Sequence, residues 1–216
     1  MLAAQLAYAQ QLVNILNGKI GNADELIFAA ERMNASDSAY VGKYYALTQN
    51  VDLSSVENFP MISKFTGTFD GKGYTISNLT IEHTGSSYYR SAFIDQNSGT
   101  VCDVTFDNAT INALYDRTSS GVAGAAVVVG ENCQDGVISC VTVKNSLVNA
   151  PKVPKAAAIT SMNSRAGNTA VTNIATVRNC AVINTTLIGG PRAEGNTYGL
   201  MMGGIAGYQG TSTIEN

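Results

Sequence analysis

Two carboxylates and the single histidine of the chain are the residues best placed to do chemistry. Glu82 and Asp107 hold the same position in successive copies of a repeated segment, and His83 follows Glu82 directly. If the copies stack, the carboxylates lie about 5 Å apart, the separation that a retaining glycosidase uses, and one pKa is raised. The same position holds Lys144 and Ile183 in later copies. We therefore favour a solvated face of variable charge over catalysis.

A second group of polar residues offers oxygen ligands for calcium. Asn50, Asp52 and Asp70 are the candidates, although Asp70 precedes a glycine and is better suited to stabilising a turn. The Gly71-Lys72-Gly73 segment is a turn and not a phosphate loop, because no GK[ST] follows a glycine-rich strand. One histidine at a corner position leaves no Ser/His/Asp or Cys/His arrangement. We assign no catalytic, cofactor-binding or metal-binding residue and expect no cofactor.

The four cysteines are Cys102, Cys133, Cys140 and Cys180. They form no CxxC motif and no Cys/His pair, which argues against a structural zinc site. Three of them fall in the repeated strands, where cysteine can pack as a small apolar residue. No two occupy matching repeat positions, so we favour buried free thiols over a disulfide.

Two helices precede the repeat. The first carries apolar residues on one face at spacings of three and four: Leu2, Leu6, Ala9, Val13 and Leu16. This pattern predicts a helix from Leu2 to Leu16 that covers an apolar surface. Asn22, with Glu25 three residues on, predicts an N-cap and a second helix to about Met33.

The repeated segment has the pattern of a strand with a bend. Its copies are TISNLTI from Thr75, TVCDVTF from Thr100, VISCVTV from Val137, TVRNCAV from Thr176, and TIEN from Thr213. Aligning Ile76, Val101, Ile138, Val177 and Ile214 gives spacings of 25, 37, 39 and 37 residues. Periods of this size indicate a solenoid or a propeller.

Corner residues decide between these architectures. The first and fourth residues of the pattern are both apolar, so the chain must bend between them to keep both on one face. The bend position holds Asn78, Asp103, Cys140 and Asn179, and a second corner holds His83, Asn108, Asn145 and Asn184. Asn and Asp tolerate a left-handed backbone. Few hairpin signals argue against a propeller.

We therefore predict an all-β fold, a parallel β-helix with about three strands per turn and an N-terminal helical cap. The helical segment spans residues 1–42 and the repeats span residues 43–216, which begin a further copy without completing it. The FTGTFDGKG stretch, from Phe65 to Gly73, is expected to form a hairpin that closes one end of the stack.

A family resemblance rests on the same residues. YALTQNVDL from Tyr45, FTGTFDGKGYTISNLTI from Phe65, and GGIAGY with TIEN near the C-terminus resemble the GLUG-repeat proteins of bacterial surfaces and secretions. The resemblance covers about residues 24–216 and is most specific at the opening stretch. The glycine-containing strand of the family is degenerate at Ser91 to Ile94 and at Gly124 to Val127, and its glycines are lost altogether at Ala156 to Ser161. Asn50 stands where the family usually has Asp. The resemblance implies a right-handed parallel β-helix on an extracellular protein, with no defined activity.

Net charge and composition exclude some classes of function. The net charge is −3 and the thirteen Lys and Arg residues are scattered, so no nucleic-acid partner is expected. No apolar run is long enough to span a membrane. We expect a non-enzymatic, extracellular or cell-surface, adhesin-like module whose export signal lies outside this chain. A polysaccharide lyase or hydrolase is the alternative, and a phage fibre or spike segment is a third.

The expected partner is a host or bacterial glycan or a surface protein. Tyr88, Tyr89 and Tyr115 lie in insertions between strands. Exposed tyrosines could stack on sugars, and buried ones could pack over a helix.

Overall fold

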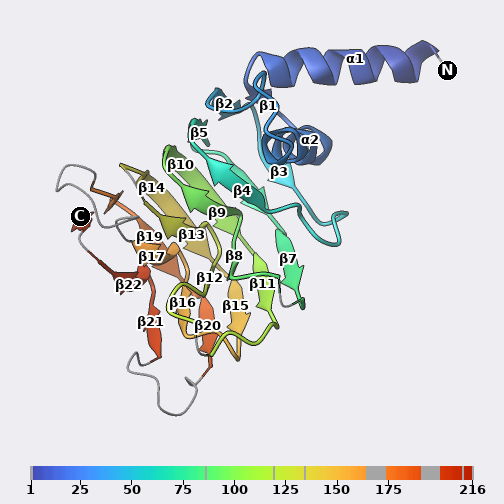
Figure 1. Cartoon of the computed structure of the whole chain (residues 1–216). Helices are drawn as coiled ribbons and strands as arrows, with labels where there is room; N and C mark the ends of the chain where they lie inside the picture. The colour runs from blue at the N-terminus through green and yellow to red at the C-terminus, as the bar shows by residue number, and fades with distance from the viewer. Residues whose placement is uncertain are drawn as a thin grey trace.

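The chain folds as a parallel β-helix with two helices at its N-terminal end, as Figure 1 shows. This computed structural model describes residues 2–85, 87–118, 120–133, 135–163, 174–190, 200–210 and 212–215. Strands pair in parallel with the strands of the next turn. The predicted all-β, parallel β-helix class is confirmed.

The first helix, α1 (Leu2–Leu16), has the predicted bounds but not the predicted buried face. Leu6, Val13 and Leu16 are exposed, and Ile15 is the residue that packs into the core; the side chain of Leu2 lies outside the described residues. Gly18 follows with a φ of 70°, and α1 projects away from the sheets (Figure 1). The helix therefore does not cover the apolar surface that its pattern predicts.

The second helix, α2 (Ala23–Asn34), packs against β4 (Ile62–Phe65) and covers one end of the core. As predicted, the Asn22 side chain caps it by accepting a hydrogen bond from the Glu25 backbone N–H at 2.9 Å. The Glu25 carboxylate accepts from the backbone N–H of Gly21 at 2.6 Å, one residue before the cap. The proposed boundary at residue 42 stays a prediction.

Four parallel sheets form the walls of the solenoid. Sheet 1 contains β1 (Lys19–Ile20), β2 (Tyr44–Leu47), β3 (Val51–Asp52), β5 (Thr68–Asp70), β6 (Thr75–Ser77), β10 (Thr100–Asp107), β14 (Val137–Lys144), β18 (Thr176–Arg178), β19 (Ala181–Ile183) and β23 (Thr213–Glu215). Sheet 2 contains β7 (Thr80–His83), β11 (Thr110–Ala113), β15 (Leu147–Ala150) and β20 (Thr186–Gly189).

Apart from β4, the strands of the other two sheets come from the stretch of chain between each sheet 2 strand and the next sheet 1 strand. Sheet 3 contains β8 (Arg90–Ser91), β12 (Gly124–Ala126), β16 (Lys155–Ala157) and β21 (Met201–Gly203). Sheet 4 contains β4, β9 (Ile94–Asn97), β13 (Val129–Asn132), β17 (Thr160–Asn163) and β22 (Ala206–Gln209). A turn therefore uses four strands and not three, because the chain bends inside this stretch and places its two halves in different sheets.

The register confirms part of the predicted alignment. Val101 pairs with Ile138, Ile138 with Val177, and Val177 with Ile214. The predicted alignment of the first copy, Ile76 with Val101, is wrong. Val101 pairs with Phe69, and Ile76 pairs with Phe106. Four residues connect Asp70 to Thr75, whereas two connect the paired Cys102 to Thr105, so the first turn contains a longer corner.

Both predicted corners exist, with two residues reassigned. Positive φ values of 52° to 54° mark Lys72, Asp103, Cys140 and Asn179 at the first corner. The second corner holds Asn78, Asn108, Asn145 and Asn184, also at positive φ. Asn78 therefore belongs to the second corner. His83, whose φ is not in the left-handed region, lies in β7 opposite Ala113.

The predicted hairpin at Phe65 to Gly73 is also wrong. β4 ends at Phe65 in sheet 4 and β5 begins at Thr68 in sheet 1, and the two strands do not pair. β5 lies instead between β2 and β10. Gly67 makes this corner, since a Cβ there would lie 2.1 Å from the carbonyl oxygen of Lys43.

A ladder of buried amides crosses the interior along sheet 4. The Asn97 side chain donates to Asn132 at 2.8 Å, Asn132 donates to Asn163 at 3.0 Å, and Asn163 donates to Gln209 at 3.2 Å. The three asparagines have no exposed surface. Asn97 also donates to the Gly99 carbonyl just before β10, Asn132 to the Gly136 carbonyl just before β14, and Asn163 to the Thr213 carbonyl at the start of β23. These bonds tie the ends of sheet 4 strands to the starts of sheet 1 strands.

Candidate functional site

The Glu82 and Asp107 pair does not exist in the structure. Glu82 lies in sheet 2 opposite Asn112, and Asp107 lies in sheet 1 opposite Lys144. Asp107 accepts a hydrogen bond from Asn145 at 2.9 Å and forms an ion pair with Lys144 at 3.2 Å. These partners hold the pKa of Asp107 below its usual value. The pairing was wrong because the alignment placed Ile76 opposite Val101.

The three calcium candidates bind protein groups of their own. Asp70 accepts hydrogen bonds from the Tyr44 hydroxyl at 2.7 Å and from the Lys72 backbone N–H at 2.9 Å, which is the turn role favoured above. Asp52 accepts from Ser54 and Asn78, and Asn50 accepts from the backbone of Thr75. Within the described part of the chain, no three His, Cys, Asp or Glu side chains gather as a metal site would require.

The four cysteines are free thiols, as predicted. Their burial differs from the prediction: Cys133 is buried, Cys102 and Cys180 are half-buried, and Cys140 is exposed. Cys140 occupies a corner, where the side chain points outward and not into the core. Burial raises the pKa of the Cys102, Cys133 and Cys180 thiols above the ordinary value, so these three are poor nucleophiles.

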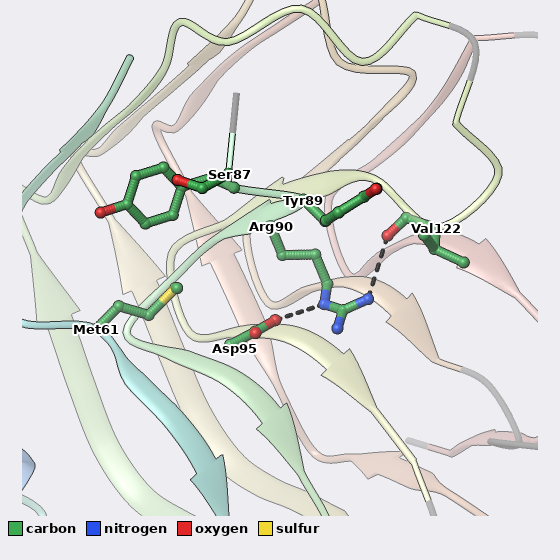
Figure 2. Close-up of a pocket in the computed structure, with 7 residues that line it drawn as sticks. Met61, Ser87, Tyr89, Arg90, Asp95 and Val122 are labelled. Carbon is green, nitrogen blue, oxygen red and sulfur yellow. Dashed lines mark hydrogen bonds and ion pairs between the residues drawn. The ribbon is translucent and has the colours of Figure 1, made fainter. Parts of the chain in front are cut away.

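The structure reveals a cleft of about 240 Å³ where the chain passes from sheet 2 to sheets 3 and 4. Its lining residues are Met61, Ser87, Tyr88, Tyr89, Arg90, Asp95 and Val122. Tyr88 and Tyr89 come from the connection between β7 and β8, Arg90 begins β8, and Asp95 lies in β9. Figure 2 shows Arg90 at the centre of the cleft, pointing toward Asp95 and the backbone carbonyl of Val122.

Arg90 is held in place by groups from two turns. Its Nε atom donates to Asp95, one Nη atom donates to the Val122 carbonyl at 3.2 Å, and the same Nη lies 3.3 Å from Glu131 on the next turn. Gly130 leaves space for this side chain, because a Cβ there would lie 3.0 Å from Arg90 carbons. Burial raises the pKa of Asp95, and the Arg90 guanidinium opposes part of that rise.

The two cleft tyrosines have exposed rings, and each ring is held by contact with another protein group. Tyr88 is 37% exposed and stacks on the His83 ring, with centroids 3.7 Å apart. Tyr89 is 48% exposed, and the Arg117 guanidinium lies 4.2 Å from the centroid of its ring. Each ring is therefore oriented by a protein group while it remains accessible to a ligand. Of the three tyrosines proposed for sugar contact, Tyr115 is buried and does not line the cleft.

A serine and the histidine meet beneath the cleft, a contact that the sequence analysis did not predict. The Oγ of Ser91 lies 2.8 Å from Nδ1 of His83 and 3.4 Å from the Tyr115 hydroxyl, which donates to the Gly124 carbonyl at 3.2 Å. Ser91 has no exposed surface and His83 is buried. Because no substrate carbonyl can reach the serine, this cluster supports Tyr88 and does not form a nucleophile.

The buried imidazole makes stability depend on pH. Burial lowers the pKa of His83 to about 4, below its usual 6.5. The unfolded chain then binds more protons than the folded one between these values, so stability is lost as pH falls from 6.5 toward 4. We expect a loss of about 2 kcal/mol, which allows for screening by solvent. Urea unfolding of the wild type and His83→Phe should show this slope in the wild type alone; equal slopes would contradict it.

Comparisons with known proteins support the fold but do not assign the chain to a family. No family model matches the chain, so membership of the GLUG-repeat family is not confirmed. A crystal structure of a protein designated an immunoglobulin A1 protease, from Bacteroides ovatus, superposes with a TM-score of 0.60 and 17% identity, over 88% of this chain and 52% of that one. At this identity the likeness shows a shared fold alone.

One sequence relative is a much longer protein. Halomucin of Haloquadratum walsbyi is 30% identical over 129 residues, which is 50% of this chain and 1% of Halomucin. The chain thus spans about half the length of the solved protein and a small part of Halomucin. Neither helix has the length and apolar character needed to cross a bilayer, as judged over the described residues.

Proposed function

We propose that this protein is a non-enzymatic, extracellular or cell-surface, adhesin-like module that binds a glycan in the cleft at Tyr88 and Tyr89. The observation that carries the proposal is the pairing of two oriented, exposed tyrosines with the Arg90–Asp95 ion pair in one small cleft. Sugars are bound by such sites because an aromatic ring covers their apolar face while polar side chains bind their hydroxyls.

The surroundings of the cleft support binding rather than a structural role alone. The surrounding turns form a rigid stack, and a rigid scaffold keeps a preformed site at low entropic cost. The glycan proposed here is a host or bacterial surface glycan, and a surface protein that carries it would be the partner.

Removing the more exposed tyrosine is expected to weaken binding. Tyr89→Ala should lower the affinity for a recognised glycan about tenfold, the equivalent of about 1.4 kcal/mol, because the ring supplies most of the apolar contact. Isothermal titration of hits from a glycan array measures the change.

The matched control is Tyr44→Ala. Tyr44 is 49% exposed and also has a cation over its ring, the Lys72 ammonium at 5.7 Å, but it lies on sheet 1 outside the cleft. This variant should bind like the wild type. An equal loss in both variants, or none in Tyr89→Ala, would contradict the proposal.

The enzymatic alternative can be tested in the same cleft. Asp95 is the carboxylate that lines the cleft. Both Asp95 and Glu131 are ion-paired with Arg90, so neither is a free acid or nucleophile. We expect incubation with neutral and acidic polysaccharides to release no reducing ends or unsaturated products. Cleavage that Asp95→Asn abolishes would establish the enzyme instead. A trimer detected by light scattering would favour the fibre-segment alternative.

A further inference from the structure

The polar groups of the cleft point to a particular class of sugar. We propose that the cleft takes one uncharged sugar ring, bound through neighbouring hydroxyls by Arg90 and Asp95, and that it discriminates against sialylated, sulfated and uronic sugars. This inference rests on the proposed glycan-binding function.

The Arg90 guanidinium in the cleft is already paired with two carboxylates. Arg90 lies between the carboxylates of Asp95 and Glu131, and both ion pairs are largely shielded from water, with the Arg90 side chain 10% exposed. Lys64 on β4 also acts on Asp95 electrostatically, and the Arg117 guanidinium is held on the Tyr89 ring while its Nε donates to the Tyr88 carbonyl. An anionic sugar that bound at Arg90 would therefore bring its charge next to the Asp95 and Glu131 carboxylates, which already pair with that guanidinium.

The hydrogen-bonding groups complement hydroxyls rather than anions. Asp95 can only accept hydrogen bonds when it is ionised, and Arg90 can only donate. They lie side by side, joined from Nε to a carboxylate oxygen. A sugar hydroxyl both donates and accepts, so one hydroxyl can donate to Asp95 while its neighbour accepts from Arg90. A carboxylate or sulfate group only accepts, which would leave the Asp95 oxygen facing like charge.

The size of the cleft matches one ring. Its volume of about 240 Å³ falls below the ~300–1,000 Å³ of pockets that enclose drug-sized ligands. Met61 and Val122 supply apolar walls, and Tyr88 and Tyr89 supply aromatic ones. The binding groups are preorganised, since Gly130 and the Val122 carbonyl fix the Arg90 side chain before a ligand arrives.

The test compares matched glycans on the full chain. Neutral oligosaccharides ending in galactose, N-acetylgalactosamine or mannose are titrated beside the same glycans capped with sialic acid or sulfate. We expect capping to weaken binding about tenfold or more, because like charges meet in the cleft. Equal or tighter binding of the capped glycans would overturn the inference and leave glycan binding standing. If no glycan binds a chain that melts cooperatively, the proposed function fails as well.

Variants that remove a negative charge test whether the carboxylates cause the preference for neutral glycans. Asp95→Asn keeps the shape of the side chain and removes one negative charge, so the preference for neutral glycans should fall about threefold or more. Asp135→Asn is the control, an exposed turn residue at a φ of 65° that asparagine tolerates, and it should leave the preference unchanged. If Asp95→Asn fails to fold, Glu131→Gln must lower the preference instead. An unchanged preference in a folded Asp95 or Glu131 variant would overturn the inference.

Discussion

Replacing Asn132 with alanine is expected to lower the free energy of unfolding by about 4 kcal/mol. The Asn132 side chain accepts a hydrogen bond from Asn97 and donates to Asn163, to the Gly136 carbonyl at 3.0 Å and to the Thr176 carbonyl at 3.2 Å. The substitution leaves several buried groups without partners, and each unsatisfied group costs about 1–3 kcal/mol. The loss in the free energy of unfolding is expected to be distributed over the ladder residues, because they act as one hydrogen-bonded network.

Asn149→Ala provides the comparison for this prediction. Asn149 forms a similar amide pair with Asn112 at 3.1 Å, but on the outside of sheet 2 and only half-buried. Water can replace that partner, so the loss should stay below about 1 kcal/mol. Chemical denaturation of both variants measures the difference. Similar losses in the two variants would mean that the buried ladder does not carry the stability assigned to it.

Phe93→Ala is expected to destabilise the fold by about 4 kcal/mol, the usual range for a buried phenylalanine. Phe93 has no exposed surface, and its ring contacts Phe59, Phe69 and Phe106 at centroid distances of 5.2, 5.5 and 5.3 Å. Phe69 and Phe106 come from sheet 1, and Phe59 comes from the connection between β3 and β4. One substitution therefore opens a cavity that no single neighbour can fill.

Thermal and urea unfolding of Phe93→Ala should be compared with Phe28→Ala. Phe28 lies half-buried on α2, in edge contact with Tyr40 at 5.8 Å. Its removal exposes little new surface and should reduce stability by about 1 kcal/mol. If Phe93→Ala proves no more damaging than this control, the four-ring cluster is not the centre of the core.

The fold class could be predicted from the sequence because apolar and corner residues recur, but the register of the first turn could not. Val101-x-Asp103-Val104-x-Phe106 and Phe106-x-Asn108-Ala109-x-Ile111 share one spacing, because each describes an inward residue, a left-handed corner and two more inward residues. The segment from Ile76 to Ile81 fits either corner. Pairing with Phe106 and Ile111 shows that it forms the second.

The buried amide ladder left a signal that the sequence analysis missed. Asn97, Asn132, Asn163 and Gln209 each come three residues after a position that the sheet 4 register aligns. Recurrence of an amide at a fixed offset after an apolar stretch indicates a stacked interior position. Asparagine was expected at exposed corners, where left-handed backbone explains it, and not inside the core.

The cleft could be predicted only in part. Two of the three tyrosines singled out from the sequence do line it, since the insertion after β7 brings them to the surface. Arg90, Asp95 and Glu131 gave no signal, because they meet only through the stacking of β9 and β13 and the bend that joins β8 to β9. Tyr115 lies in a comparable insertion, yet it folds inward over Ser91.

The central claim is that the Tyr88 and Tyr89 cleft binds a neutral sugar. It is tested most directly by ¹H–¹⁵N NMR of the full chain during titration with the tightest-binding neutral glycan. We predict shifts at the Arg90 Nε–H and at the backbone amides of Ser87 and Tyr89, with the corner amides of Asn108 and Asn145 unchanged. Saturable shifts that cluster away from the cleft, with none at Arg90 or Tyr89, would contradict the claim.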